Sequence, residues 1–86
     1  MKTIIDVATE VILERCKNYE FIEFNEIFEV VEKELQELWQ QKAENAGIEY
    51  SKFVQAKMGE LYKIMTIDSR FVRNDQGLWT KKRGFE

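Results

Sequence analysis

The sequence contains no histidine, no proline and a single cysteine, Cys16. One cysteine excludes an internal disulfide, and without histidine the chain lacks a common zinc ligand and the base of Ser–His and Cys–His catalytic pairs. The four glycines are scattered, so no glycine-rich phosphate loop is present. We therefore expect no enzyme activity, cofactor, metal site or small-molecule substrate. We interpret Cys16 as a small, inert and at least half-buried residue of a cytoplasmic protein.

Long apolar runs are also absent. Asp6 and Glu10 interrupt the apolar N-terminus, which argues against a signal peptide, and no uncharged stretch approaches the ~20 residues that a membrane span needs. What the chain does have is 44% hydrophobic and 13% aromatic residues within a length of 86. That is enough for one compact core and too little for two. We expect a single folded domain over residues 1–86 that does not enter a membrane.

Hydrophobic periodicity predicts three helices. The first is expected at residues 3–17, the second from an N-cap at Asn25 to about Glu44, and the third after an N-cap at Ser51. Gly47 is expected to end the second helix. The expected apolar faces are Ile4, Val7, Ala8, Val11 and Ile12; then Ile27, Phe28, Val31, Leu35, Leu38 and Trp39; and then Val54, Met58, Leu61, Tyr62 and Met65. Gly59 interrupts the third helix at a cost of ~1 kcal/mol, for which close approach of another helix is one explanation.

The remaining segments have the character of strands. Residues 20–24 are short and aromatic, which indicates a brief strand or extended link. Residues 70–73 and 78–81 flank an Asn-Asp-Gln-Gly turn and predict a hairpin. The expected fold is therefore mainly α with a small β hairpin: a winged helix-turn-helix of three helices, a short strand and a C-terminal wing.

The string from Leu61 to Thr80 carries a family resemblance. The pattern is an aromatic in the third helix, an Asp-small-Arg-Phe turn and a wing that ends in a tryptophan strand. In this chain these elements are Tyr62, Ile67, Asp68, Arg70, Phe71 and Trp79. The string resembles the N-terminal winged-helix domain of the bacterial RNA polymerase delta subunit, of Gram-positive type, which belongs to the HARE-HTH group. A weaker match extends back to the Phe-Asn-Glu-Ile sequence at residues 24–27.

Physical reasoning assigns these signature residues a structural role. Ile67, Phe71 and Trp79 would cover the end of the three-helix core. Asp68 would accept hydrogen bonds from backbone amides after it in the sequence. Arg70 would form an ion pair either with Asp68 or with the acidic second helix. The resemblance implies a monomeric transcription accessory module that docks on core RNA polymerase and improves transcriptional specificity and recycling. The family also has a long acidic tail, whereas the sequence after Trp79 is basic.

The charge distribution leaves two functions open. Residues 1–50 carry twelve acidic and five basic side chains, whereas residues 51–86 carry four acidic and eight basic ones. An acidic surface on the second helix is the candidate polymerase-facing site; its residues are Glu26, Glu29, Glu34 and Glu37. The alternative is DNA binding through the third helix and the wing; its candidate contacts are Lys52, Gln55, Lys57, Lys63, Arg73, Lys81, Lys82 and Arg83. A third possibility is a homodimeric or structural interaction domain that uses Tyr19, Tyr50 or Phe85.

Overall fold

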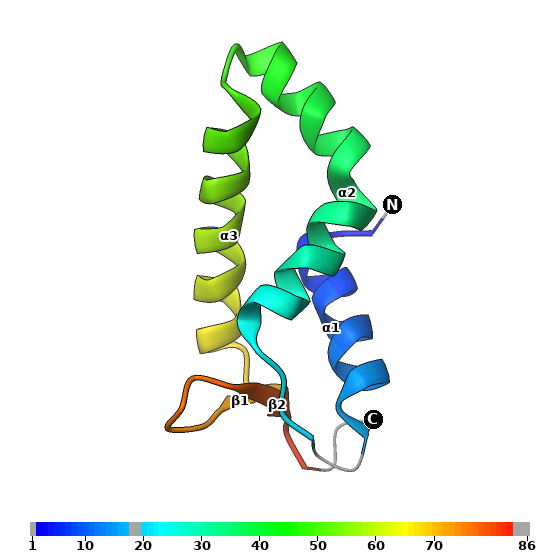
Figure 1. The fold of residues 1–86 in the computed structure, drawn as a ribbon, viewed down its shortest axis with the longest axis vertical. Coiled ribbons are helices and arrows are strands. Elements are labelled where there is room, and N and C mark those ends of the chain that lie inside the picture. The colour runs from blue at the N-terminus through cyan, green and yellow to red at the C-terminus, as the bar shows by residue number, and fades with distance from the viewer. Residues whose placement is uncertain (1, 18–19, 84–86) are drawn as a thin grey trace.

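The computed structural model describes residues 2–17 and 20–83 and contains three helices followed by a two-stranded antiparallel sheet (Figure 1). The helices are α1 (Ile4–Arg15), α2 (Phe24–Ala46) and α3 (Tyr50–Ile67). The strands are β1 (Phe71–Arg73) and β2 (Trp79–Lys81). The order confirms the predicted mainly helical chain with a small C-terminal hairpin.

The first helix begins with a capping box. The Thr3 hydroxyl accepts a hydrogen bond from the Asp6 N–H at 3.2 Å, and the Asp6 carboxylate accepts one from the Thr3 N–H at 2.9 Å. The helix ends before Cys16, which has left the helical conformation but still bonds through its N–H to the Ile12 carbonyl. The predicted range of 3–17 was therefore too long at both ends.

The second helix begins earlier than predicted. Its N-cap is Glu23, which makes no side-chain cap bond, so the prediction of Asn25 as N-cap was wrong. Packing explains the early start: the Phe24 ring stacks on Phe28 at 6.2 Å and meets Tyr62 edge-on at 5.3 Å. These contacts hold the residue before Asn25 within the first turn of the helix.

The third helix also begins one residue before the predicted cap. Its N-cap is Glu49, again without a side-chain cap bond, and Ser51 lies inside the helix. The Tyr50 hydroxyl donates a hydrogen bond to the Glu32 carboxylate at 3.2 Å, which ties the start of α3 to α2. Gly47 does end α2 as expected, because it adopts a left-handed conformation with φ of 69°.

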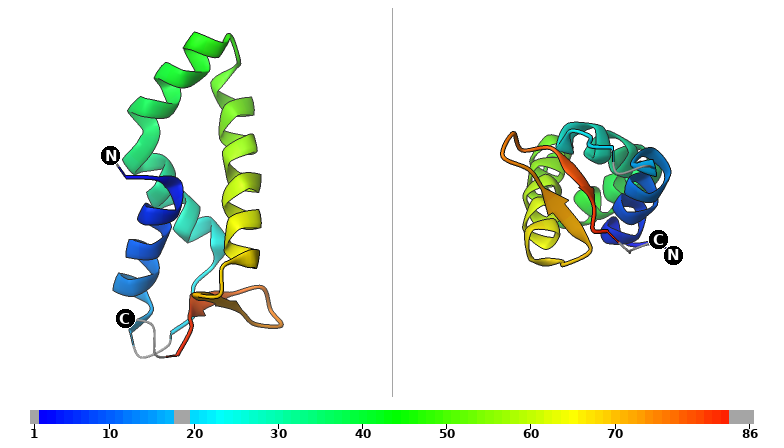
Figure 2. Two further views of the ribbon diagram at one scale, coloured as in Figure 1. Left: turned by 180° about the vertical axis from the view of Figure 1, so that it is seen from behind. Right: turned by 90° about the horizontal axis from the view of Figure 1, so that it is seen from below.

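The sheet lies across one end of the three helices, as the right-hand view of Figure 2 shows. β1 pairs with β2 in the register Phe71 to Lys81 and Arg73 to Trp79. On the other side of β2, Ile22 and Trp79 exchange two backbone hydrogen bonds of 2.8 Å each. The predicted short strand after the first helix is thus a single bridge residue beside the hairpin.

A single core joins the three helices to the sheet. Its largest fully buried side chains include Ile12, Ile27, Leu61, Met65 and Trp79. All five apolar-face residues predicted for α1 are buried or half-buried, but on α3 Met58 and Tyr62 are partly exposed. Gly59 has nothing within 4 Å of the position its Cβ would take, so the explanation by close helix packing was wrong.

The signature residue Ile67 does not cover the core. Its side chain is 78% exposed, whereas Phe71 and Trp79 are buried as predicted. The buried face of α3 passes through Leu61 and Met65, and a residue two positions after Met65 points away from that face. The helix then ends, because the next residue, Asp68, is extended.

The helices differ in length, and this gives the molecule an elongated shape of 42 × 25 × 18 Å. α1 has 12 residues and α2 has 23. In Figure 1, α1 lies beside only the half of α2 nearer the sheet, and the other half of α2 forms a projecting hairpin with α3.

Candidate functional site

The turn between α3 and β1 is organised by Asp68 and Arg70. An Asp68 carboxylate oxygen accepts hydrogen bonds from the Arg70 backbone N–H at 2.9 Å and from its Nε at 3.0 Å. The other oxygen lies 2.6 Å from the Arg70 Nη2. These hydrogen bonds hold the pKa of Asp68 below its usual value and raise the pKa of Arg70. The predicted Asp68–Arg70 contact is confirmed.

An aromatic cluster connects this turn region to the wing. The Tyr62 ring meets Trp79 edge-on at 6.0 Å, and the Arg73 guanidinium lies 5.8 Å from the Tyr62 ring centre. Arg73 also donates a hydrogen bond to the Tyr62 hydroxyl. The Tyr62 and Arg73 side chains are exposed, so they form a surface patch at the junction of α3 and the wing.

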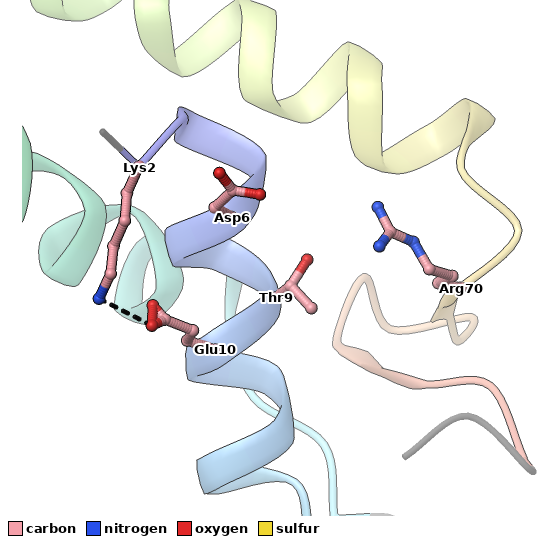
Figure 3. Close-up of a pocket in the computed structure, with 5 residues that line it drawn as sticks. All are labelled: Lys2, Asp6, Thr9, Glu10 and Arg70. Carbon is pink, nitrogen blue, oxygen red and sulfur yellow. Dashed lines mark hydrogen bonds and ion pairs between the residues drawn. The ribbon is translucent and has the colours of Figure 1, made fainter.

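A hollow of about 490 Å³ separates this turn from α1 (Figure 3). The Arg70 guanidinium faces Asp6 and Thr9 across it. The polar groups of the walls are satisfied locally: Lys2 pairs with Glu10 at 2.8 Å, and the Thr9 hydroxyl donates to the Ile5 carbonyl at 2.7 Å. The hollow is therefore a polar surface feature whose groups already have partners.

All four candidate acidic residues of α2 are exposed. Glu26 lies 4.0 Å from Arg15 of α1. The pKa of Lys2 is raised chiefly by the hydrogen bond that its ammonium group donates to Glu10, and the nearby charge of Glu34 adds to this effect. Neither Glu29 nor Glu37 makes an ion pair with another described residue. The acidic surface is thus open to solvent along α2.

The candidate nucleic-acid residues fall on different parts of the molecule. Lys52, Gln55 and Lys63 are exposed and lie on the outward face of α3, with Gly59 between them. Lys57 lies on another side of α3, where it pairs with Glu60 at 3.1 Å and sits 5.4 Å from the Phe53 ring centre. It therefore does not extend the outward basic face.

The wing presents fewer exposed basic side chains than predicted. Arg73, Lys82 and Arg83 are exposed, but Lys81 is only 8% exposed. Lys81 lies on β2 next to the buried Thr80 and Trp79, and this position withdraws it from the surface. It is poorly placed to contact a phosphate.

Of the three aromatic residues considered for a homodimeric or structural interaction surface, only Tyr50 lies within the residues that the structure describes. Tyr19 and Phe85 lie outside the described residues, as does Asn18 near the predicted end of the first helix. Tyr50 is half-buried and bonded to Glu32, so it packs within the molecule. Cys16 is fully buried, as predicted, and its Sγ lies 3.8 Å from the Trp79 carbonyl oxygen.

Sequence reasoning missed one surface feature, a groove between α1 and the α2–α3 hairpin that has Lys2 and Lys42 at its edge. These lysines lie in acidic stretches of the sequence, so only the placement of α1 brings them together.

No group of three potential metal ligands occurs within residues 2–17 and 20–83. None of the described helices is both long and apolar enough to cross a bilayer. Comparison with known proteins gives no match to a family model, a curated protein or a solved structure.

Proposed function

We propose that this chain is a winged-helix module that docks on core RNA polymerase as a monomeric, non-catalytic accessory and modulates transcription. The observation that carries the proposal is the Asp68-Ser69-Arg70-Phe71 turn between α3 and β1, which the Asp68–Arg70 pair holds and the buried Phe71 anchors to the core. The motif joins a helix to a strand here, as it does in the delta-subunit domain that the sequence resembles.

The arrangement of the elements supports the winged-helix part of the proposal. Ile22, β2 and β1 lie side by side in that order, after α1 and at the end of the helices. A short strand between the first two helices that pairs with the wing is the expected topology of this class. The outward face of α3 is exposed, as the recognition helix of a helix-turn-helix is.

The charge of α2 supports a protein partner for the docking surface. Glu29 and Glu37 are exposed and without ion-pair partners in the described chain, so they would repel a phosphate backbone and attract a basic protein surface. Charges at the rim of an interface act mainly on the association rate and specificity. The proposed contact is therefore sensitive to salt.

The test is equilibrium binding of the labelled protein to nuclease-treated core RNA polymerase from a Gram-positive bacterium, at near-physiological salt. We expect saturable binding, and we expect the double variant Glu29→Lys/Glu37→Lys to weaken it about tenfold. Asp75→Lys at the exposed wing turn is the matched control for the single variant Glu37→Lys, because each replaces one exposed carboxylate by a lysine. Absence of binding by the folded protein would overturn the proposal.

A second candidate function, DNA binding, is favoured by the outward face of α3. Lys52 and Lys63 flank Gln55 and Gly59 there, and Arg73 and Lys82 extend positive charge to the wing. The lysines could contact phosphates and Gln55 a base edge. Lys52→Glu/Lys63→Glu should abolish binding to duplex DNA and spare polymerase binding if the two surfaces are separate. Lys81→Glu is not a suitable test, because Lys81 is buried.

A further inference from the structure

A groove lies where α1 falls short of the distal half of the α2–α3 hairpin. Its volume is about 370 Å³, within the usual range of ~300–1,000 Å³ for ligand pockets. Ile4 of α1 and Leu35, Leu38 and Trp39 of α2 line it. α1 begins at Ile4, near the middle of α2, and no other helix within residues 2–17 and 20–83 lies along that side of the hairpin (Figure 1).

The apolar lining of this groove is only partly covered. Leu35 and Trp39 are almost fully buried in the core, but Ile4 and Leu38 are half-exposed at the groove. The row of apolar, core-facing side chains on α2 thus continues past the N-terminal end of α1. A helix placed end to end with α1 would cover these side chains in the same way that α1 covers the first half of the row.

Three lysines stand around the groove, one on each helix or its approach: Lys2 before α1, Lys42 on α2 and Lys57 on α3. Glu60 is the one acidic residue among those that line it. The lining residues therefore carry an excess of positive charge, with Glu10 and Glu34 beside Lys2 just outside the lining, whereas the net charge of the chain is −3. This excess also contrasts with the acidic outer surface of α2.

These lysines are available to a partner. Lys42 makes no ion pair or hydrogen bond with any residue in the described part of the chain. Lys2 pairs with Glu10 and both side chains are exposed, whereas Lys57 is half-buried beside the exposed Glu60. Ion pairs at the surface contribute ~0–1 kcal/mol. A carboxylate brought in by a ligand could therefore replace either partner at little cost.

We propose that this groove binds an acidic amphipathic helix from another protein, with its apolar side chains on the half-exposed Ile4 and Leu38 and its carboxylates beside the three lysines. A helix is the expected form, because the groove is bounded by helices and runs on from the end of α1. Apolar anchors at helical spacing would enter such a groove. The groove adjoins the acidic face of α2 at Glu34, which lies near Lys2, but it shares no lining residue with that face, and the proposal does not depend on polymerase docking.

The test uses a synthetic peptide of about 15 residues, a length at which isolated helices begin to form. It is built from leucine, alanine and glutamate, with leucines on one helical face, and it is capped at both ends. Binding is followed through the two tryptophan indole N–H signals in ¹H–¹⁵N spectra of the intact chain. We expect the Trp39 signal to shift saturably. The signal of Trp79, which lies in β2 and does not line the groove, should not shift and serves as an internal reference.

Two comparisons establish the chemistry of recognition. A peptide with every glutamate replaced by lysine keeps the apolar face and should bind at least about tenfold more weakly. Lys42→Glu should weaken binding of the acidic peptide by a similar factor. Lys33→Glu is the matched control on the same helix, because Lys33 is exposed but does not line the groove. It should leave the affinity unchanged.

The proposal is overturned by any of three results. The first is an unmoved Trp39 signal at saturating acidic peptide. The second is equal binding of the acidic and basic peptides, which would indicate non-specific apolar contact. The third is equal effects of Lys42→Glu and Lys33→Glu, which would indicate a general charge effect. Lys42 is exposed, so its variant is expected to fold, and unchanged amide spectra outside the groove verify this.

Discussion

The carboxylate of Asp68 lies 2.6 Å from the guanidinium of Arg70 and also accepts a hydrogen bond from the Arg70 backbone N–H. Asp68 is the residue at which α3 ends, and Arg70 is the residue before β1. The Asp68 side chain therefore stabilises the turn that connects α3 to β1. The Arg70 guanidinium in turn lies 5.6 Å from the ring centre of the buried Phe71.

Asp68→Asn should destabilise the fold modestly. Asparagine keeps the size of the side chain and one oxygen that can accept the backbone hydrogen bond, but it removes the charge. Because the Arg70 side chain is 42% exposed, solvent screens the pair, and we expect a loss of about 1 kcal/mol in the free energy of unfolding. Urea unfolding at neutral pH measures it. Asp75→Asn, at the exposed wing turn, is the control and should change little.

The same pair predicts a pH dependence. The hydrogen bonds from Arg70 hold the pKa of Asp68 below its usual value in the folded protein, so the unfolded chain takes up this proton first as the pH falls. The stabilisation is full above the unfolded pKa of about 4 and is lost as the pH falls through the folded pKa. The stability difference between wild type and Asp68→Asn should therefore shrink below about pH 4. A difference that stays constant there would show that charge is not its cause.

Leu61 and Ile67 on α3 allow truncation of a buried apolar side chain to be compared with truncation of an exposed one. Leu61→Ala should cost ~2–5 kcal/mol, because Leu61 is fully buried and its loss leaves a cavity. Ile67→Ala should change stability by less than ~0.5 kcal/mol, because the side chain is 78% exposed. Chemical unfolding of both variants tests this. A large loss for Ile67→Ala would restore the covering role that the sequence suggested for it.

The helices and the hairpin were predictable because their signals are local. Apolar spacing along α2 and the Asn-Asp-Gln-Gly turn depend only on neighbouring residues, and both predictions are confirmed. The helix starts were predicted wrongly, because aromatic packing of Phe24 and the Tyr50–Glu32 hydrogen bond decide them, and these involve residues distant in sequence. Local capping preference is weaker than such contacts.

The surfaces were harder to predict than the core. The burial of Lys81 depends on the position of β2 between β1 and Ile22, which the sequence does not express. The lysine-edged groove depends on where α1 begins relative to α2. In contrast, the Asp68–Arg70 contact was predictable, since its partners are two residues apart.

Cys16 should be protected from thiol reagents in the folded protein. It is fully buried, and burial is the main cause that raises the pKa of its thiol. We expect modification by a disulfide reagent to require unfolding, so its rate should rise steeply with urea. A rate equal to that of a free thiol in the absence of urea would contradict the buried position.

The raised pKa of Cys16 also has a consequence at high pH. The folded state keeps the proton to a higher pH than the unfolded chain does, so this contribution is full below the unfolded pKa of about 8.5 and is lost as the pH rises through the folded pKa. Cys16→Ala removes the titration. The stability of wild type relative to Cys16→Ala should therefore fall as the pH is raised above about 8.5.

Gly59→Ala should stabilise the protein. Gly59 lies inside α3, and nothing lies within 4 Å of the position that an added Cβ would take. Alanine is favoured over glycine in a helix interior by ~1 kcal/mol, so we expect a gain of about that size in the free energy of unfolding. Gly47→Ala is the control. Its φ of 69° is left-handed, so the same substitution there should cost ~1–2 kcal/mol.

Gly59→Ala also separates an effect on folding stability from an effect on DNA binding. Since Gly59 lies between Lys52 and Lys63 on the outward face of α3, a methyl group there would enter any contact made by that face. If DNA binds there, Gly59→Ala should raise stability in urea unfolding yet weaken duplex binding. Unchanged affinity in the stabilised variant, alongside binding that Lys52→Glu/Lys63→Glu abolishes, would mean that the lysines reach the phosphates while the helix backbone stays clear of the DNA.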